Sequence, residues 1–120
     1  MLTIEVIEDD AAMRTLLTEW LREDGYRVRS RSGMGASVVD DVDLLVIDLL
    51  DLPGQGTTTV DRARKLYPKA AVIGISTQLS RTLAPDSSQA RALSVDRLVS
   101  KPCSRWELVD AVVDTIGAAT

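Results

Sequence analysis

The chain has no histidine and only a single cysteine, Cys103. The absence of histidine excludes a histidine acid–base pair, a histidine-containing catalytic triad and a histidine zinc site. One cysteine cannot form a disulfide within the chain, and this usage fits a reducing compartment. We therefore expect a cytoplasmic protein whose chemistry uses other side chains.

Long apolar runs and a basic leader are also missing. The uninterrupted apolar stretches are only a few residues long, whereas a helix that crosses a bilayer needs about 20. No basic segment followed by a long apolar region stands at the N-terminus, so we expect neither a membrane span nor a secretion signal. The net charge is −4, with acidic residues at strand ends, which argues against a nucleic-acid-binding domain.

What the chain does contain is a globular composition. Its 120 residues are 45% apolar and 27% charged, which suits one domain over residues 1–120 with a substantial core. Short apolar segments alternate with segments of helical periodicity, the pattern of an α/β domain with helices on both faces of a parallel sheet, three layers in all. The expected strands are residues 2–7, 26–31, 44–48, 70–76 and 96–100.

Helices are expected between these strands and after the last one. The first ends at Gly25 and has an apolar face formed by Met13, Leu16, Leu17, Trp20 and Leu21. The last begins at Ser104, where Glu107 completes a capping box. Trp106, in its first turn, is expected to pack in or near the core.

The helices in the middle of the chain carry weaker signals. A short helix is expected near residues 34–41, and another, with Val60, Ala63, Leu66 and Tyr67 facing inward, ends before Pro68. After the fourth strand we expect a loop to about residue 85 and a short helix over 86–94, because Pro85 cannot lie inside a helix.

Carboxylates follow two of the apolar strands. Glu8 and Asp9 come directly after the first strand, and Asp48 ends the third. In an open parallel sheet with strand order 2-1-3-4-5 these two strands are neighbours, and their carboxyl ends meet at the point where strand order reverses. Three anionic groups so close together repel one another unless a proton or a cation lies among them, and Mg²⁺ prefers such oxygen ligands.

Two further strand ends supply complementary groups. Ser76 ends the fourth strand with a hydroxyl, and Lys101 follows the fifth with a cation on a long stem. Taken singly, each is most simply a turn hydroxyl or a solvated charge. Together with the carboxylates and a divalent metal they could neutralise a phosphoryl group on Asp48, a reaction that needs positioning and charge neutralisation more than proton transfer.

At these residues the sequence resembles the receiver domains of bacterial two-component response regulators. The segments VIEDDAAMRTLL, DLLVIDLLDLPGQG, AVIGIST and LVSKPCSRWEL stand in the order and spacing of that family. The resemblance covers the whole chain and implies a flavodoxin-like fold, a five-stranded sheet in order 2-1-3-4-5, and a single receiver domain with no output domain in this chain.

The resemblance also implies a role for each candidate residue. Asp48 matches the phosphoacceptor, and Glu8 and Asp9 match the acidic pair that holds Mg²⁺ directly or through water. Leu50 would offer its backbone carbonyl to the metal. Ser76 matches the hydroxyl that bonds the phosphoryl group and Lys101 the lysine that pairs with it; the family's peptide bond from Lys101 to the following proline is cis.

Three departures from the family pattern affect how a signal would leave the domain. The family usually has proline four residues after the phosphoacceptor, whereas here Pro53 is at five, so the loop over 49–56 should run differently. Thr77, the residue after Ser76, is larger than the small residue that the family usually has at this position. Leu98 replaces the usual Tyr or Phe, so an aromatic side chain that rotates on phosphorylation cannot be the switch.

The function implied is phosphorelay signalling. Asp48 would take a phosphoryl group from a histidine kinase or histidine phosphotransfer protein and change a surface that binds a downstream effector; homodimer formation stays open. Such a protein is no enzyme beyond its own phosphorylation and slow dephosphorylation. The alternative is a degenerate receiver that binds proteins without phosphorylation. A flavodoxin or a haloacid-dehalogenase-type phosphatase is disfavoured, because EDDAA and DLLD do not match their motifs.

Overall fold

Five parallel strands form one sheet in the order β2-β1-β3-β4-β5. The computed structural model describes residues 1–49, 54–76, 94–101 and 103–119. Each strand coincides with one of the predicted apolar segments, so the predicted sheet and its order are confirmed. The strands are β1 (Thr3–Ile7), β2 (Arg27–Arg31), β3 (Leu44–Asp48), β4 (Ala71–Ser76) and β5 (Arg97–Ser100).

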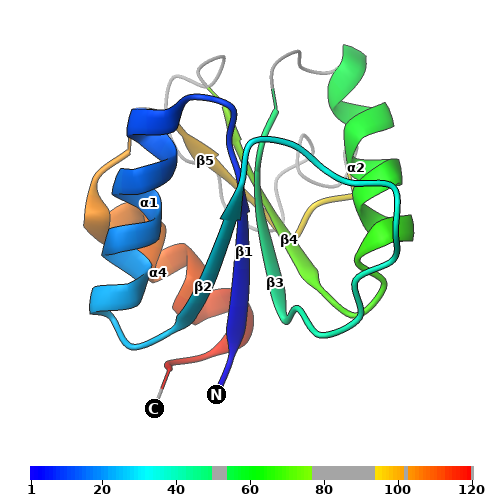
Figure 1. Ribbon diagram of the computed structural model, residues 1–120. Helices are drawn as coiled ribbons and strands as arrows, with labels where there is room; N and C mark the ends of the chain where they lie inside the picture. The colour runs from blue at the N-terminus through cyan, green and yellow to red at the C-terminus, as the bar shows by residue number, and fades with distance from the viewer. Residues whose placement is uncertain (50–53, 77–93, 102, 120) are drawn as a thin grey trace.

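Helices cover both faces of this sheet, as Figure 1 shows. Helices α1 (Ala11–Glu23) and α4 (Arg105–Ile116) lie together on one face, and α2 (Gly54–Leu66) lies on the other. The architecture is therefore the predicted three-layer, flavodoxin-like α/β fold. None of the helices in the described ranges is long and apolar enough to span a bilayer.

The alternation of side chains along each strand divides the core in two. In β1, for example, Ile4 and Val6 face α1 and α4, whereas Ile7 faces α2. The same alternation in β3 sends Leu44 and Val46 to one side and their neighbours to the other. Apolar side chains therefore cover both faces of the central strands β3 and β4, as expected for a parallel sheet covered by helices, whereas β1 also carries Glu5 in its middle.

Capping residues define where two of the helices begin. Asp10 accepts a hydrogen bond from the backbone N–H of Met13 at 2.9 Å and so caps α1. At α4, Ser104 Oγ accepts from the N–H of Glu107, whose side chain accepts in return from the N–H of Ser104, both at 3.1 Å. The capping box predicted for the last helix is thus confirmed.

The helix predicted near residues 34–41 is wrong. Residues 32–43, all described by the structure, form an irregular connection without a helix between β2 and β3. Gly33 and Gly35 disfavour a helix there. The connection instead buries apolar side chains against the α2 face of the sheet. Val42 is buried there, and Met34 and Val39 are partly buried. The loop predicted after β4 lies outside the described residues, and so does the helix predicted over 86–94 except for its last residue, Ser94, which lies in a turn.

Two side chains predicted to face the core are exposed instead. Leu16 in α1 is 40% exposed, and Trp106 in the first turn of α4 is 71% exposed. Helical spacing identifies an apolar stripe but does not set how wide a stripe the neighbouring elements cover. Leu17 and Leu21 on α1 and Leu108 on α4 are fully buried, as predicted.

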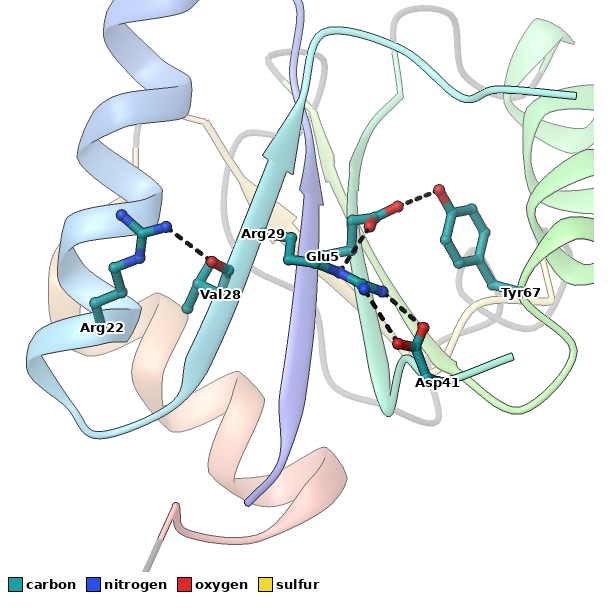
Figure 2. A network of polar contacts seen from close by, with 6 residues as sticks. All are labelled: Glu5, Arg22, Val28, Arg29, Asp41 and Tyr67. Atoms are coloured by element: carbon teal, nitrogen blue, oxygen red, sulfur yellow. Dashed lines mark hydrogen bonds and ion pairs between the residues drawn. The ribbon is translucent and has the colours of Figure 1, made fainter. Parts of the chain in front are cut away.

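A buried carboxylate, Glu5 in the middle of β1, is the main polar group of the core. It is 3% exposed and lies on the α2 face, where the hydroxyl of Tyr67 donates to it. Arg29 of β2 forms an ion pair with it, Nε to Oε1 3.3 Å, and also binds Asp41 with two hydrogen bonds of 2.8 and 3.1 Å (Figure 2). The Glu5 carboxylate therefore joins the edge strand, through Arg29, to the residue that follows α2, and Arg29 in turn holds the irregular connection through Asp41.

Removing the Tyr67 hydroxyl should therefore destabilise the protein. Burial and the hydrogen bond to Glu5 raise the pKa of Tyr67 to about 12, so the hydroxyl stays protonated and donates throughout the usual pH range. In Tyr67→Phe one oxygen of the buried carboxylate loses its donor, and we expect a loss of about 1–3 kcal/mol in the free energy of unfolding. Urea unfolding should show a lower midpoint with an unchanged slope.

Tyr26→Phe is the matched control for this change. The Tyr26 hydroxyl is also in a buried side chain, but it donates to the backbone carbonyl of Gly117 at 2.7 Å. Gly117 is exposed, so water can replace the lost donor and the loss should stay below about 1 kcal/mol. Equal losses in the two variants would contradict a special role for the Glu5 contact.

Candidate metal and phosphoryl site

Three carboxylates meet at the carboxyl edge of the sheet, as predicted. Register pairs Ile7 with Ile47, so the next residues, Glu8 and Asp48, leave neighbouring strands side by side. One oxygen from each of Glu8, Asp9 and Asp48 lies within 4.8 Å of the other two. Glu8 is buried, Asp48 is partly buried and Asp9 is exposed, so the cluster opens toward solvent on the Asp9 side.

Lys101 reaches this cluster from the far side of the sheet. It follows β5, which is separated from β1 by β3 and β4, and its side chain is only 16% exposed. The ammonium Nζ contacts Glu8 Oε1 and lies 3.4 Å from Asp48 Oδ1. The predicted convergence of the lysine on the carboxylates is therefore present, with Lys101 as the cation between two of them.

Burial and mutual contact change the protonation of these groups. Burial raises the pKa of Glu8 to about 7; the hydrogen bond from Lys101 opposes this rise, and the neighbouring Asp48 adds to it. Burial lowers the pKa of Lys101, but the hydrogen bond to Glu8 and the charge of Asp48 outweigh it, so the net shift is upward. Lys101 therefore stays charged at neutral pH, while Glu8 is poised to exchange its proton for a cation.

This raised pKa predicts how stability depends on pH without metal. A Glu8 that is harder to ionise in the folded protein contributes stability below its unfolded pKa of 4.5, and this contribution is lost as pH rises through about 7. We expect wild type in EDTA to lose more stability than Glu8→Gln between pH 5 and pH 8, by an amount on the order of a few kcal/mol. Urea unfolding across this range measures the difference; parallel curves would contradict it.

Ser76 is the last residue of β4 and is fully buried. Its backbone carbonyl accepts a hydrogen bond from the N–H of Lys101 at 2.9 Å, so these two predicted residues are neighbours at the same edge of the sheet. Leu50, predicted to offer its carbonyl to the metal, lies outside the described residues, as do Thr77, Pro53 and the proline after Lys101.

The groups present fit a hard divalent cation. Glu8 Oε2 is buried, and in the part of the chain that the structure describes it has no hydrogen-bond partner. A buried carboxylate oxygen left in this way is costly unless something binds it. Asp9 and Asp48 also line a pocket together with Ile7 and Ser32. Carboxylate oxygens beside a water-accessible pocket are the donors that Mg²⁺ takes.

Comparison with known proteins identifies the family of this chain. The family model described as the response regulator receiver domain matches residues 4–113. The chain belongs to the response regulator receiver family. Proteins of this family act in two-component signalling, where a receiver interacts with a kinase and an effector.

Individual relatives cover the receiver over nearly all of its length. The DNA-binding transcriptional regulator NtrC of Azospirillum brasilense is 30% identical over 122 residues, which are 98% of this chain and 25% of that protein. The chain thus spans a quarter of the length of this relative.

Solved structures share the fold. A response regulator from Thermotoga maritima has a TM-score of 0.71 at 16% identity, covering 98% of this chain and 99% of its own. A CheY-like receiver from Methanospirillum hungatei has a TM-score of 0.69 at 20% identity, covering 97% and 94%.

Two residues near the receiver's site were missed by the sequence analysis. Ser32 lines the pocket, and it could have been found from its place after β2, whose carboxyl end lies at the same edge. Arg14 of α1 donates from Nη1 to the backbone carbonyl of Glu8 at 2.7 Å. A contact to a backbone atom leaves no residue-type signal, so the sequence alone could not have shown it.

The residue that replaces the family's aromatic side chain is part of the core. Leu98 is fully buried on the α2 face of β5. It packs with Leu49 over Gly74, where an added Cβ would lie 2.5 Å from Leu49 Cδ1 and 3.1 Å from Leu98 Cδ2. The absence of a side chain at Gly74 lets both leucines fill this space.

Proposed function

We propose that this receiver accepts a phosphoryl group on Asp48 from the phosphohistidine of a histidine kinase or phosphotransfer protein. An Asp48 carboxylate oxygen attacks phosphorus, the phosphorus–nitrogen bond breaks, and the histidine leaves with the bonding electron pair. The product is an acyl phosphate, which water later hydrolyses to aspartate and phosphate. The single observation that carries the proposal is the convergence of Glu8, Asp9, Asp48 and Lys101 at one sheet edge.

Each residue has a defined task in this reaction. Glu8, Asp9 and Asp48, with the carbonyl of Leu50, would hold Mg²⁺, which supplies positive charge to the phosphoryl oxygens when bound. Lys101 already lies 3.4 Å from Asp48 and can turn from Glu8 to the incoming phosphoryl group. The Ser76 hydroxyl would donate to a phosphoryl oxygen. Neutralisation and positioning of this kind are the main requirements of phosphoryl transfer.

The remaining parts of the proposal follow from this chemistry. The protein works as a cytoplasmic phosphoprotein that changes a surface for a downstream effector, and it catalyses no reaction besides its own phosphorylation and dephosphorylation. Because Leu98 is a buried aliphatic residue, the change at that surface does not depend on rotation of an aromatic ring at this position.

Phosphorylation with a small donor tests the proposal directly. The chain is incubated with acetyl phosphate with and without Mg²⁺ and run on a gel that retards phosphoproteins. We expect a retarded band that requires Mg²⁺ and disappears in EDTA. Beryllofluoride, which mimics an aspartyl phosphate, should give saturable NMR shifts around Asp48 and Ser76. No retarded band and no saturable shift would overturn the proposal.

A further inference from the structure

We propose that Arg14 is a positioning residue that holds the Glu8 carboxylate in the orientation needed for the metal. The inference rests on the proposed Mg²⁺ site. Arg14 lies in the first part of α1, is partly buried, and donates from Nη1 to the backbone carbonyl of Glu8 at 2.7 Å. A charged donor makes this a stronger bond than one between two neutral groups.

The backbone of Glu8 is fastened on both sides. Its N–H donates to the carbonyl of Arg31 in β2 at 3.0 Å, and its carbonyl accepts from Arg14. Two residues on, Asp10 caps α1. The peptide groups before and after the Glu8 Cα are therefore both fixed, and with them the direction in which its side chain leaves the chain toward Asp48.

Fixing this direction matters because Glu8 is the first residue beyond β1. The parallel register of β1 with its neighbours ends one residue earlier, at Ile7. Groups that orient metal ligands from outside change metal affinity strongly, commonly by 10- to 100-fold on removal. Arg14 acts in this way through a backbone atom of the ligand residue.

If Arg14 acted only through its charge, its removal would change Mg²⁺ affinity in the direction opposite to that expected for a positioning residue. A guanidinium next to an acidic cluster repels Mg²⁺, so a role through charge alone means that its removal tightens metal binding. A positioning role means that its removal weakens metal binding. The sign of the change in affinity therefore separates the two.

The test compares Arg14→Met with Arg22→Met by calorimetric titration with MgCl₂. Arg22, also in α1, donates to the carbonyl of Val28 at 2.9 Å across the same separation of six residues (Figure 2), but this contact lies away from the acidic cluster. We expect about tenfold weaker Mg²⁺ binding in Arg14→Met, less than a twofold change in Arg22→Met, and partial recovery in Arg14→Lys. Unchanged or tighter binding in Arg14→Met would overturn the inference.

A second measurement keeps this outcome separate from that of the proposed function. If wild type takes up no Mg²⁺, the metal part of the proposed function fails. NMR of the protein in EDTA then tests whether Arg14 fixes the backbone of Glu8. We expect the amide signals of Glu8 and Asp9 to broaden in Arg14→Met and to stay sharp in Arg22→Met, because the backbone of Glu8 is released. Sharp, unshifted amide signals of Glu8 and Asp9 in Arg14→Met would contradict the inference.

Discussion

Replacing Asp48 with asparagine is expected to abolish phosphorylation of the chain by acetyl phosphate and Mg²⁺. An amide oxygen has the shape of the carboxylate oxygen but is not a nucleophile, so no acyl phosphate can form. The variant should still fold, since the asparagine oxygen can accept from Lys101, which lies 3.4 Å from Asp48 Oδ1 in wild type. Intact mass spectrometry measures the result: wild type gains one phosphoryl group and Asp48→Asn gains none.

Asp10→Asn is the matched control for this variant. Asp10 is another aspartate at the same edge, but its carboxylate caps α1, and asparagine caps a helix about as well as aspartate. We expect this variant to be phosphorylated like wild type. If Asp48→Asn were modified at the wild-type rate, the acceptor would be a different residue and the assignment of Asp48 would be wrong.

Replacing Lys101 with methionine is expected to destabilise the metal-free protein by about 3 kcal/mol at pH 8. The change leaves Glu8 and Asp48 without the cation that contacts both. Removing one partner of a buried ion pair is costly because the remaining charge has lost its compensation. The loss should shrink toward pH 5, because Glu8, whose pKa is raised to about 7 by burial, takes up a proton there. Urea unfolding in EDTA measures both effects.

Mg²⁺ should reverse much of this loss. In Lys101→Met, Mg²⁺ no longer competes with the lysine ammonium group for the carboxylates. The variant should therefore gain more stability from added Mg²⁺ than wild type does. Lys69→Met, which changes an exposed lysine before β4, serves as the control and should leave stability unchanged. A Lys101→Met variant as stable as this control at pH 8 would show that the lysine does not compensate the cluster.

The connection between β2 and β3, where a predicted helix is absent, shows the limit of prediction from local sequence. The sequence predicts a short helix near residues 34–41, but the structure has none there. The connection instead buries Val42 and partly buries Met34 and Val39 without one. Asp41 fastens it to Arg29, a contact between side chains that no local pattern indicates. A connection needs only to cross the face and bury its apolar groups, and a helix is one of several ways to do so.

The order of apolar and polar residues alone determined the strands, the two-sided sheet and the edge at which Glu8, Asp9 and Asp48 gather. This is so because side chains alternate along a strand and parallel strands end at a common edge. Only the tertiary structure decided that Lys101 reaches Glu8 across 93 residues of chain and that Tyr67 donates to Glu5 across 62. Such contacts depend on how the helices and strands pack in three dimensions, and no pattern in the intervening sequence indicates them.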